Sequence, residues 1–384
     1  MTVHALGTTP TLGEIPDRMK AIVIRANREG EPLDSMQMEE IAVPEPGPNE
    51  VLVMVMAAGV NFNGVWAARG KPVSTMRMHP DQDFHIAGSD ASGIVWKTGI
   101  AVTRWKVGDE VILHCHQSCR QCAQCNGGDP LACSEQKIWG YETNWGSFAQ
   151  YAKVQMQQLL PKPKHLSWEE AASYGLTLFT AYRMLMARAE VKPGDNVLVW
   201  GASGGLGVFA VQLCRLAGAH PIAVVSSEEK AKLVKDLGAE MIINRNEFDL
   251  TKGQSESKRF GKKIRELTDG RDPDVVFEHV GQYTFPTSVL VCKPFGKIVI
   301  CGATSGYNLS FDVRYLWMRQ KQIIGSHFAN SHQAEMANRL VIDRKIKPVL
   351  DQVFNFEDTA KAHDLMARNQ HKGKMAIRVQ APRP

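Results

Sequence analysis

Asn196-Val-Leu-Val-Trp-Gly201-Ala-Ser203-Gly204-Gly205-Leu206-Gly207 is the stretch that decides the fold of this chain of 384 residues. It opens with a short apolar run, which has the length of a buried parallel strand. Apolar residues at helical spacing follow from Leu206 to Leu216. The glycines between suit a tight turn, close approach to a pyrophosphate and close packing of helix on strand. This order predicts a dinucleotide-binding loop, with Gly201, Ser203, Gly204, Gly205, Leu206 and Gly207 at the cofactor. The alternative is a glycine-rich turn without a ligand.

The end of the next expected strand, Pro221–Val225, indicates which dinucleotide binds. An acidic residue there would accept from the ribose 2′-OH of NAD, but none is present. Hydroxyls and cations stand there instead, and they suit a 2′-phosphate: Ser226, Ser227, Lys230 and Arg245. The sequence therefore predicts NADPH, unless both cations are ordinary solvated charges.

Composition excludes several classes of protein. The chain is 44% hydrophobic and 22% charged, as globular proteins are, and its length favours two domains. A net charge of +5 is small and argues against a nucleic-acid partner. No run of 18 apolar residues indicates a membrane span, and no signal peptide is evident. Eight cysteines without a secretory signal then predict a cytoplasmic protein with reduced thiols or a metal site.

The predicted secondary structure changes near residue 163, from strands alone to alternating helices and strands. Residues 1–17 read as a loose leader, and strands separated by turn residues follow to about residue 161. From Ser167, which opens a capping box, helices and β-branched strands alternate, beginning with an expected helix over 171–187. This predicts an α/β chain in which a doubly wound Rossmann parallel sheet over 163–324 interrupts a β-rich domain of residues 1–162 and 325–384.

Four cysteines at close spacing form the densest metal-like motif, which we call the cysteine lobe: Cys119, Cys122, Cys125 and Cys133. Four thiolates on one loop can close a tetrahedral zinc site, and such a full set leaves no open position for water. The motif therefore predicts a structural zinc, with free thiols or partial metal loss as the alternative.

The two-domain plan, the cysteine lobe and the glycine loop together resemble the medium-chain dehydrogenase/reductase superfamily over nearly the whole chain. That resemblance implies a GroES-like fold for the β-rich domain. Several longer runs resemble crotonyl-CoA carboxylase/reductases and related 2-enoyl-CoA reductases: residues 139–144, 160–166, 314–318 and 325–330.

The resemblance also implies which residues act. Zinc alcohol dehydrogenases of the superfamily carry metal ligands where this chain has Asn61 and Gly88-Ser89-Asp90, so catalytic zinc is not expected. The carboxylating members hold carbon dioxide with an Asn, a Phe, a Glu and a His, which by local motif fall on Asn63, Tyr141, Glu142 and His327. Tyr141 departs from Phe, and its hydroxyl could admit a water. The alternative is that Glu142 and His327 only form a buried polar pair.

Arg314 and Tyr315 match the family's contacts to the adenine and phosphate end of CoA; the alternative is a surface charge and a core tyrosine. Two departures from typical carboxylases weigh against efficient carboxylation: a shorter segment between Trp66 and Gly88, and the presence of the cysteine lobe.

The expected function is an NADPH-dependent 2-enoyl-CoA reductase acting on an acyl-CoA thioester of the crotonyl or acrylyl type, with carbon dioxide as a second trap for the enolate. We expect a homodimer or homotetramer. The rivals are an NADPH quinone or enone reductase of the same fold and a non-enzymatic nucleotide- or RNA-binding protein.

Overall fold

The computed structural model describes residues 2–78 and 80–382. These residues form two compact units, which we call the β-rich unit (Met1–Leu176 with Asn330–Pro384) and the nucleotide unit (Thr177–Ala329). Among the described residues, no helix combines the length and apolarity needed to cross a membrane.

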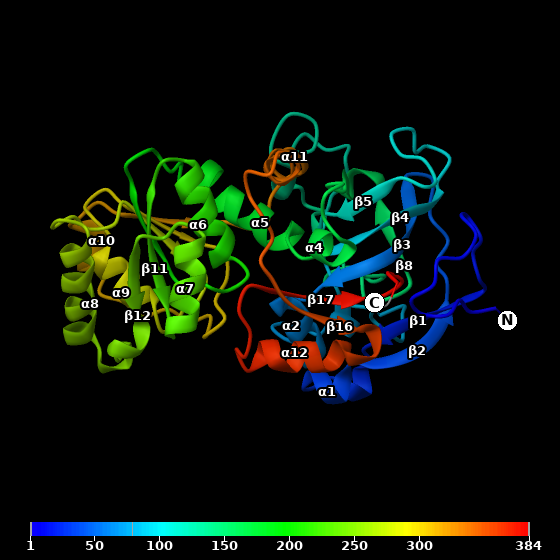
Figure 1. Cartoon of the computed structure of the whole chain (residues 1–384), viewed down its shortest axis with the longest axis horizontal. Coiled ribbons are helices and arrows are strands. Elements are labelled where there is room, and N and C mark those ends of the chain that lie inside the picture. Colours follow the sequence, from blue (N-terminus) through cyan, green and yellow to red (C-terminus); the bar gives the residue numbers. More distant parts are fainter. Residues whose placement is uncertain (1, 79, 383–384) are drawn as a thin grey trace. The chain divides into compact units, whose positions relative to one another are not determined.

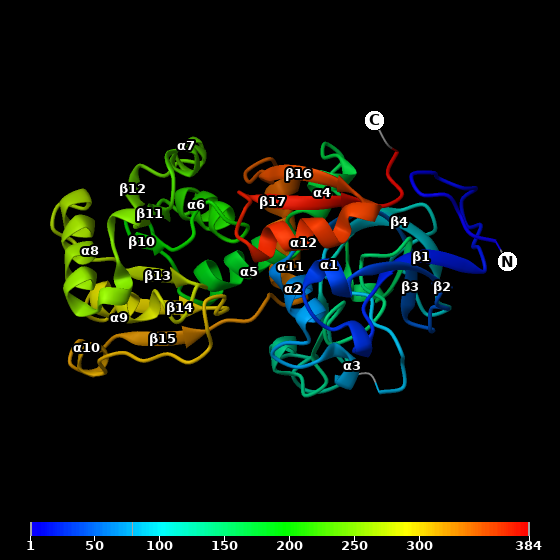
Figure 2. The same cartoon turned by 90° about the horizontal axis from the view of Figure 1, so that it is seen from below.

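The nucleotide unit is built on a six-stranded sheet in which every neighbouring pair is parallel, in the order β12-β11-β10-β13-β14-β15. Helices α6 and α7 lie on one face of this sheet, and α8 and α9 lie on the other (Figure 1). Strand β15 is an edge strand (Figure 2). The elements, in chain order, are β10 (Asn196–Val199), α6 (Gly207–Leu216), β11 (His220–Val225), α7 (Glu228–Asp236), β12 (Met241–Asn244), α8 (Gln254–Leu267), β13 (Val275–Glu278), α9 (Phe285–Val291), β14 (Lys297–Ile300), α10 (Arg314–Trp317) and β15 (Gln322–Gly325).

The core of this unit follows from its sequence pattern. All four residues of β10 and of β13 are buried, because helices cover both faces of the sheet. Trp200 stacks on Phe260 of α8 with ring centroids 5.0 Å apart, and its Nε1 donates to Ser288 of α9 at 2.8 Å. The indole thus ties both helices of one face to the end of β10.

The helix expected over 171–187 is broken in the structure. It consists of α4 (Trp168–Ala172), α5 (Gly175–Tyr182) and a π-helical segment, η4 (Arg183–Arg188). The predicted capping box is present, since Ser167 accepts from the backbone N–H of Glu170. The sequence did not reveal this break, because α4 and α5 are both largely buried and the apolar periodicity therefore continues from one to the other.

The β-rich unit is organised around β3 (Glu50–Gly59), whose last nine residues are buried. Its main sheet has the order β16-β17-β3-β4-β5-β9, with β8 also paired to β3. The other strands are β1 (Arg18–Val23), β2 (Gln37–Ala42), β4 (Ala91–Thr98), β5 (Glu110–Leu113), β6 (His116–Gln117), β7 (Lys137–Ile138), β8 (Tyr151–Gln155), β9 (Leu159–Pro161), β16 (Leu350–Asn355) and β17 (Lys374–Arg378). The helices are α1 (Pro32–Ser35), α2 (Phe62–Arg69), α3 (Thr75–Met78), α4, α11 (Ser331–Ile342) and α12 (Thr359–Ala367).

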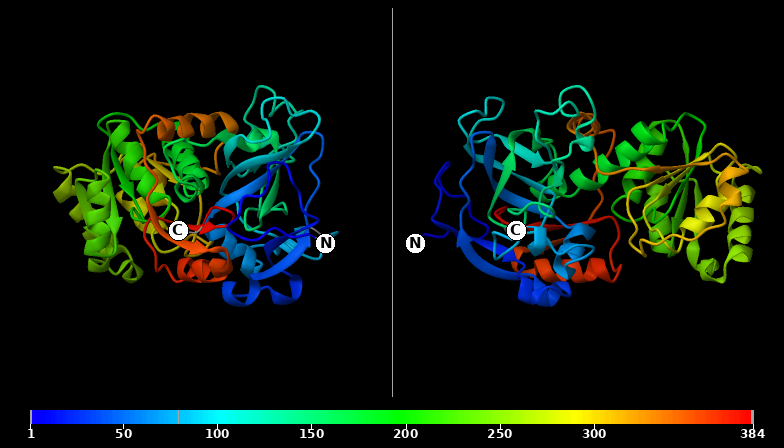
Figure 3. Two further views of the ribbon diagram at one scale, coloured as in Figure 1. Left: turned by 45° about the vertical axis from the view of Figure 1, so that its right-hand side comes forward. Right: turned by 180° about the vertical axis from the view of Figure 1, so that it is seen from behind.

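Helix α12, near the C-terminus, packs on α1 and α2, so both ends of the chain build this unit; Figure 3 shows its red ribbon beside the blue of α1. The N-terminal segment is also held, which corrects the expectation of a loose leader. Val3 bridges to Arg18, the N–H of Gly7 donates to the carbonyl of Val379 at 3.3 Å, and Trp96 Nε1 donates to the carbonyl of Glu14 at 2.6 Å.

Candidate active site

The glycine loop of the nucleotide unit connects β10 to α6, as the motif predicts. Gly201 has φ +55°, and a Cβ at Gly207 would collide with the carbonyl oxygen of Gly201. Helix α6 can therefore start this close to the strand only with glycine at 207. The N–H groups of Gly205, Leu206 and Gly207 lie at the start of α6, where the backbone donors of a helix have no partner within the helix. Free N–H groups at the start of a helix are what an anionic pyrophosphate needs.

The predicted 2′-phosphate residues gather at the ends of β11 and β12. The register pairs Val225 with Asn244, so Ser226 and Arg245 follow as neighbours. Ser227 caps α7, where its Oγ accepts from the N–H of Lys230 at 3.3 Å. The guanidinium of Arg245 has no ion-pair partner in the part of the chain that the structure describes.

One further residue belongs to this group. Asn246 Nδ2 donates to the carbonyl of Ser226 at 2.8 Å, which fixes the turn after β12 against the end of β11. Asn246 carries neither a hydroxyl nor a charge, so the sequence alone does not mark it as part of a 2′-phosphate site.

Three of the four predicted carbon dioxide contacts lie in the β-rich unit. Two glycines bring their segments together: Gly88 (φ +107°) and Gly140 (φ +73°) pass so closely that a Cβ at Gly140 would strike the backbone of Gly88. The N–H of Gly88 donates to the carbonyl of Gly140 at 3.2 Å. Beside this crossing, Asn63 Nδ2 donates to Ser89 Oγ at 2.6 Å. The two glycines therefore join the Ser89 segment, which orients Asn63, to the segment carrying Tyr141 and Glu142.

Tyr141 and Glu142 are each anchored to backbone. The Tyr141 hydroxyl donates to the carbonyl of Lys71 at 2.7 Å, so its proton is directed at the protein. Glu142 Oε2 accepts from the N–H of Ile138 at 2.8 Å. These bonds fix the loop that follows β7.

A buried ionic network stands where zinc dehydrogenases of the superfamily hold metal ligands. Lys374 Nζ donates to Asn61 Oδ1 and lies 3.7 Å from Asp90 Oδ2, and both charged side chains are 1% exposed. Asn61 Nδ2 donates to Asp90 at 2.8 Å, and the N–H of Leu176 donates to its other oxygen at 2.6 Å. Burial lowers the pKa of Lys374 to about 8, and the charge of Asp90 opposes this shift. Protein donors thus engage both oxygens of Asp90.

His327 belongs to the nucleotide unit, two residues after the end of β15. Its side chain is exposed by surface area, yet neighbouring groups desolvate the imidazole and, with a smaller contribution from Arg183, lower its pKa. The imidazole is therefore neutral near pH 7 and can donate one hydrogen bond and accept another.

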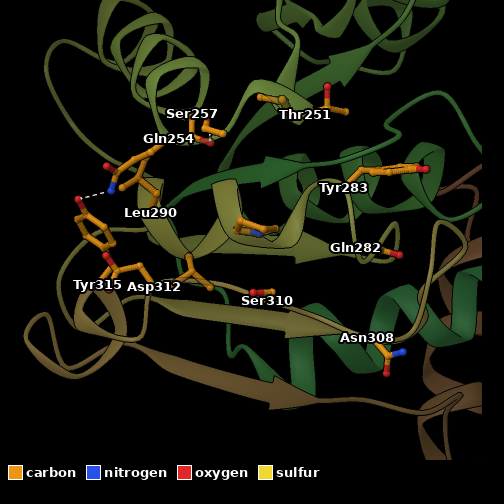
Figure 4. A pocket seen from close by; sticks show the side chains of 14 residues that line it. Thr251, Gln254, Ser257, Gln282, Tyr283, Leu290, Asn308, Ser310, Asp312 and Tyr315 are labelled. Carbon is orange, nitrogen blue, oxygen red and sulfur yellow. Dashed lines mark hydrogen bonds between the residues drawn. The ribbon is translucent and has the colours of Figure 1, made fainter.

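The predicted CoA residues lie beside a cavity of about 470 Å³ in the nucleotide unit. Tyr315 lines it, and its hydroxyl accepts from Gln254 Nε2 at 2.6 Å; Figure 4 shows these side chains pointing toward one another. Arg314 is exposed and forms a two-pronged ion pair with Asp312, with a shortest N···O distance of 2.7 Å. An exposed pair of this kind is weak, so a phosphate can replace the carboxylate on Arg314.

The four cysteines of the lobe converge as the spacing predicts. All four sulfurs lie within 4.8 Å of one another, with separations such as 3.5 Å for Cys133–Cys119, 3.6 Å for Cys122–Cys125 and 4.0 Å for Cys119–Cys125. A tetrahedral site with Zn–S bonds of about 2.3 Å requires sulfurs about 3.8 Å apart. The donor set therefore fits zinc in both chemistry and size.

The chain matches two family models and several known proteins. Residues 47–164 match the family model of the alcohol dehydrogenase GroES-like domain, and residues 205–343 match that of the zinc-binding dehydrogenases. A crotonyl-CoA carboxylase/reductase of Cereibacter sphaeroides is 53% identical over 99% of this chain and 92% of its own. A crotonyl-CoA reductase of Streptomyces avermitilis is 46% identical over 96% of this chain and 90% of its own.

One solved structure shows both ligands in a relative. A 2-octenoyl-CoA carboxylase reductase, in complex with NADP and 2-octenoyl-CoA, superposes with a TM-score of 0.93 at 40% identity, covering 96% of this chain and 89% of that one. The chain belongs to the medium-chain dehydrogenase/reductase superfamily, among the crotonyl-CoA carboxylase/reductases and related enoyl-CoA reductases.

Proposed function

We propose that this protein is an NADPH-dependent 2-enoyl-CoA reductase, with substrates of the crotonyl-CoA or acrylyl-CoA type, that can also carboxylate the product enolate. The observation that carries the proposal is the 53% identity, over 99% of the chain, to a crotonyl-CoA carboxylase/reductase. The glycine loop, which leads into the N-terminal end of α6, and Arg245 beside Ser226 support NADPH as the cofactor.

The chemistry needs no Lewis-acid metal. The thioester carbonyl of an enoyl-CoA already polarises the double bond, so the β-carbon is electrophilic as it stands. NADPH, when bound, supplies a hydride to that carbon, which leaves an enolate on the substrate. The network of Asn61, Asp90 and Lys374 then has a structural role, because it fixes the N-terminal end of α2, the helix that carries Asn63.

The enolate can take up carbon dioxide or a proton at its α-carbon. We infer that Asn63, Glu142 and His327 favour carbon dioxide, because amide and imidazole N–H groups can donate to its oxygens and preorganised donors act without reorganisation. Ser89 orients the amide of Asn63, and the N–H of Ile138 orients Glu142. Tyr141 fixes the loop between them through Lys71.

We further propose that the cavity beside Tyr315 receives the adenine end of CoA, with Arg314 gripping phosphate. The cysteine lobe is proposed to hold one structural zinc through Cys119, Cys122, Cys125 and Cys133, a fit supported by their sulfur separations. A cytoplasmic location is proposed because none of the eight cysteines forms a disulfide among the described residues. A homodimer or homotetramer is proposed from exposed Trp317 and Met318, before the edge strand β15, and from exposed Ile323 within it.

The experiment that tests the function follows NADPH consumption with crotonyl-CoA and acrylyl-CoA, with and without bicarbonate and carbonic anhydrase, and identifies the products by mass. We expect turnover with at least one thioester, and a product heavier by one carboxyl group when bicarbonate is present. Turnover only with quinones or with enones lacking CoA, or no turnover at all, would contradict the proposal.

A further inference from the structure

The short span that carries His327 is anchored in the nucleotide unit at its start. The carbonyl of Gly325 accepts from Arg188 Nε at 3.1 Å, and the N–H of Ser326 donates to the carbonyl of Ile300 at 2.8 Å. These two bonds hold the backbone beyond β15 as far as Ser326, the residue directly before His327. The upstream end of the span is therefore fixed.

Its downstream end is anchored in the β-rich unit by the cysteine lobe. Asn330 caps α11, since its Oδ1 accepts from the N–H of Gln333 at 2.9 Å and Gln333 returns a bond to its N–H at 3.2 Å. The remaining amide group, Nδ2, donates to Asp129 Oδ1 at 3.2 Å. Asn330 thus uses both ends of its side chain: one for its own helix and one for the lobe.

Asp129 is itself built into the lobe. The same oxygen accepts from the N–H of Leu131 at 3.2 Å and caps the turn Pro130–Ala132, which leads directly to Cys133. An aspartate held by the turn before a metal-site cysteine presents its oxygen to Asn330 in one orientation. The lobe is thereby linked, through a single carboxylate, to the residue three positions after His327.

The backbone between the two anchors is strained. Phe328 has φ +41°, in the left-handed region that a bulky side chain rarely adopts. Its ring lies beside that of His327, with centroids 4.0 Å apart. Such a conformation persists only when the surroundings hold it, and it is found where position matters to function.

We propose that Asp129 is a positioning residue for His327: it fixes the downstream end of the 327–329 span and so restricts the conformations open to the imidazole. The link to carboxylation rests on the proposed function. Asn330 thereby couples the segment that carries His327 to the cysteine lobe.

The test uses Asn330→Asp, which keeps a residue able to cap α11 but removes the donor to Asp129 and sets two carboxylates together. We expect hydrogen exchange of the 327–330 amides to become about two- to tenfold faster, as the loss of one hydrogen bond allows. The ratio of carboxylated to reduced product should fall, while the KM for NADPH stays unchanged.

Two further variants exclude a general loss of structure. Asp129→Asn alone should behave like the wild type, because its carboxamide oxygen still accepts from both donors. Combined with Asn330→Asp, it should restore slow exchange, because the carboxamide at 129 can now donate to the carboxylate at 330. Wild-type exchange in Asn330→Asp, failure of the exchanged pair to rescue, or faster exchange with an unchanged product ratio would each overturn the proposal. A wild type that makes no carboxylated product refutes the carboxylase function instead, and the exchange rates still decide whether Asp129 fixes the span.

Discussion

Arg245 stands where two parallel strands end, next to Ser226 and with its charge unpaired among the described residues. A guanidinium so placed can bind the 2′-phosphate of NADPH, which NADH lacks. Losing a charged hydrogen bond to phosphate costs about 1.5–3 kcal/mol, or roughly ten- to a hundredfold in affinity. Arg245→Ala should therefore raise the KM for NADPH by that factor and barely change that for NADH. Lys235→Ala, an exposed cation on α7, is the control. Equal efficiency of the wild type with both cofactors would refute the assignment.

His363 predicts a pH dependence of stability. It is completely buried on α12, its Nδ1 lies 2.8 Å from the carbonyl oxygen of Thr359, and burial lowers its pKa to about 4. The unfolded chain protonates this histidine near its ordinary pKa of 6.5, so between pH 6.5 and 4 the unfolded state binds more protons. The free energy of unfolding should fall through that window, by about 2–3 kcal/mol at pH 4.5.

Urea unfolding of wild type and His363→Gln at pH 7 and pH 4.5 checks this. The variant should lose less stability than the wild type over the same interval, because it lacks the imidazole of His363. The carboxylates and the remaining histidines titrate alike in both proteins. An identical loss in both proteins would show that His363 does not contribute.

At the scale of one element, we predict that the cysteine lobe binds one zinc ion. Four thiolates close the loop between β6 and β7, and metal binding to such a set contributes directly to folding. Elemental analysis should find about one zinc per chain. Cys122→Ser should release it and lower the unfolding temperature while leaving the rate of enoyl reduction nearly unchanged. Cys301→Ser, a thiol outside the lobe, should retain zinc. A metal-free wild type with the same stability would contradict the assignment.

The elements that the sequence predicted well are those with local signals. Glycine spacing, a capping box and apolar periodicity are properties of neighbouring residues, and they correctly predicted the parallel sheet, the loop before α6 and the start of α4. Features that depend on distant contacts were missed. The sequence of the N-terminal segment does not show that it is held, because its hydrogen bond joins the distant residues Glu14 and Trp96. The break before α5 was missed because the apolar pattern continues through it. The nucleotide unit also begins later than the expected residue 163, because α4 packs on β3 and β4 of the other unit.

The same distinction holds within the site. Resemblance supplied Asn63, Tyr141 and Glu142, but it did not reveal what orients them. Lys374 reads as an ordinary charge at the start of a strand, and only the fold brings it to Asp90. Such a pair leaves no local pattern, since its members are far apart in the chain and each is unremarkable by itself.

At the scale of the whole chain, the predicted carbon dioxide contacts come from both units: three from the β-rich unit and His327 from the nucleotide unit. Reduction requires only the cofactor, the thioester and their alignment. Carboxylation also requires that a small, uncharged and weakly bound molecule reach the enolate before a proton does. Variants of Asn63, Glu142 and His327 should therefore separate the two reactions.

The fate of the enolate is accordingly the sharpest prediction. His327→Asn and Glu142→Ala should each lower the carboxylated share of product by about tenfold or more, as the loss of a preorganised donor or its support does. NADPH oxidation should fall much less. Tyr141→Phe is the matched control: because its hydroxyl is directed at the Lys71 carbonyl, we expect about 1 kcal/mol of lost stability and a product ratio within about twofold of the wild type. Mass analysis of products at saturating bicarbonate decides. If His327→Asn slows reduction and carboxylation equally, the imidazole serves hydride transfer or folding, and the selection of carbon dioxide must lie elsewhere in the chain.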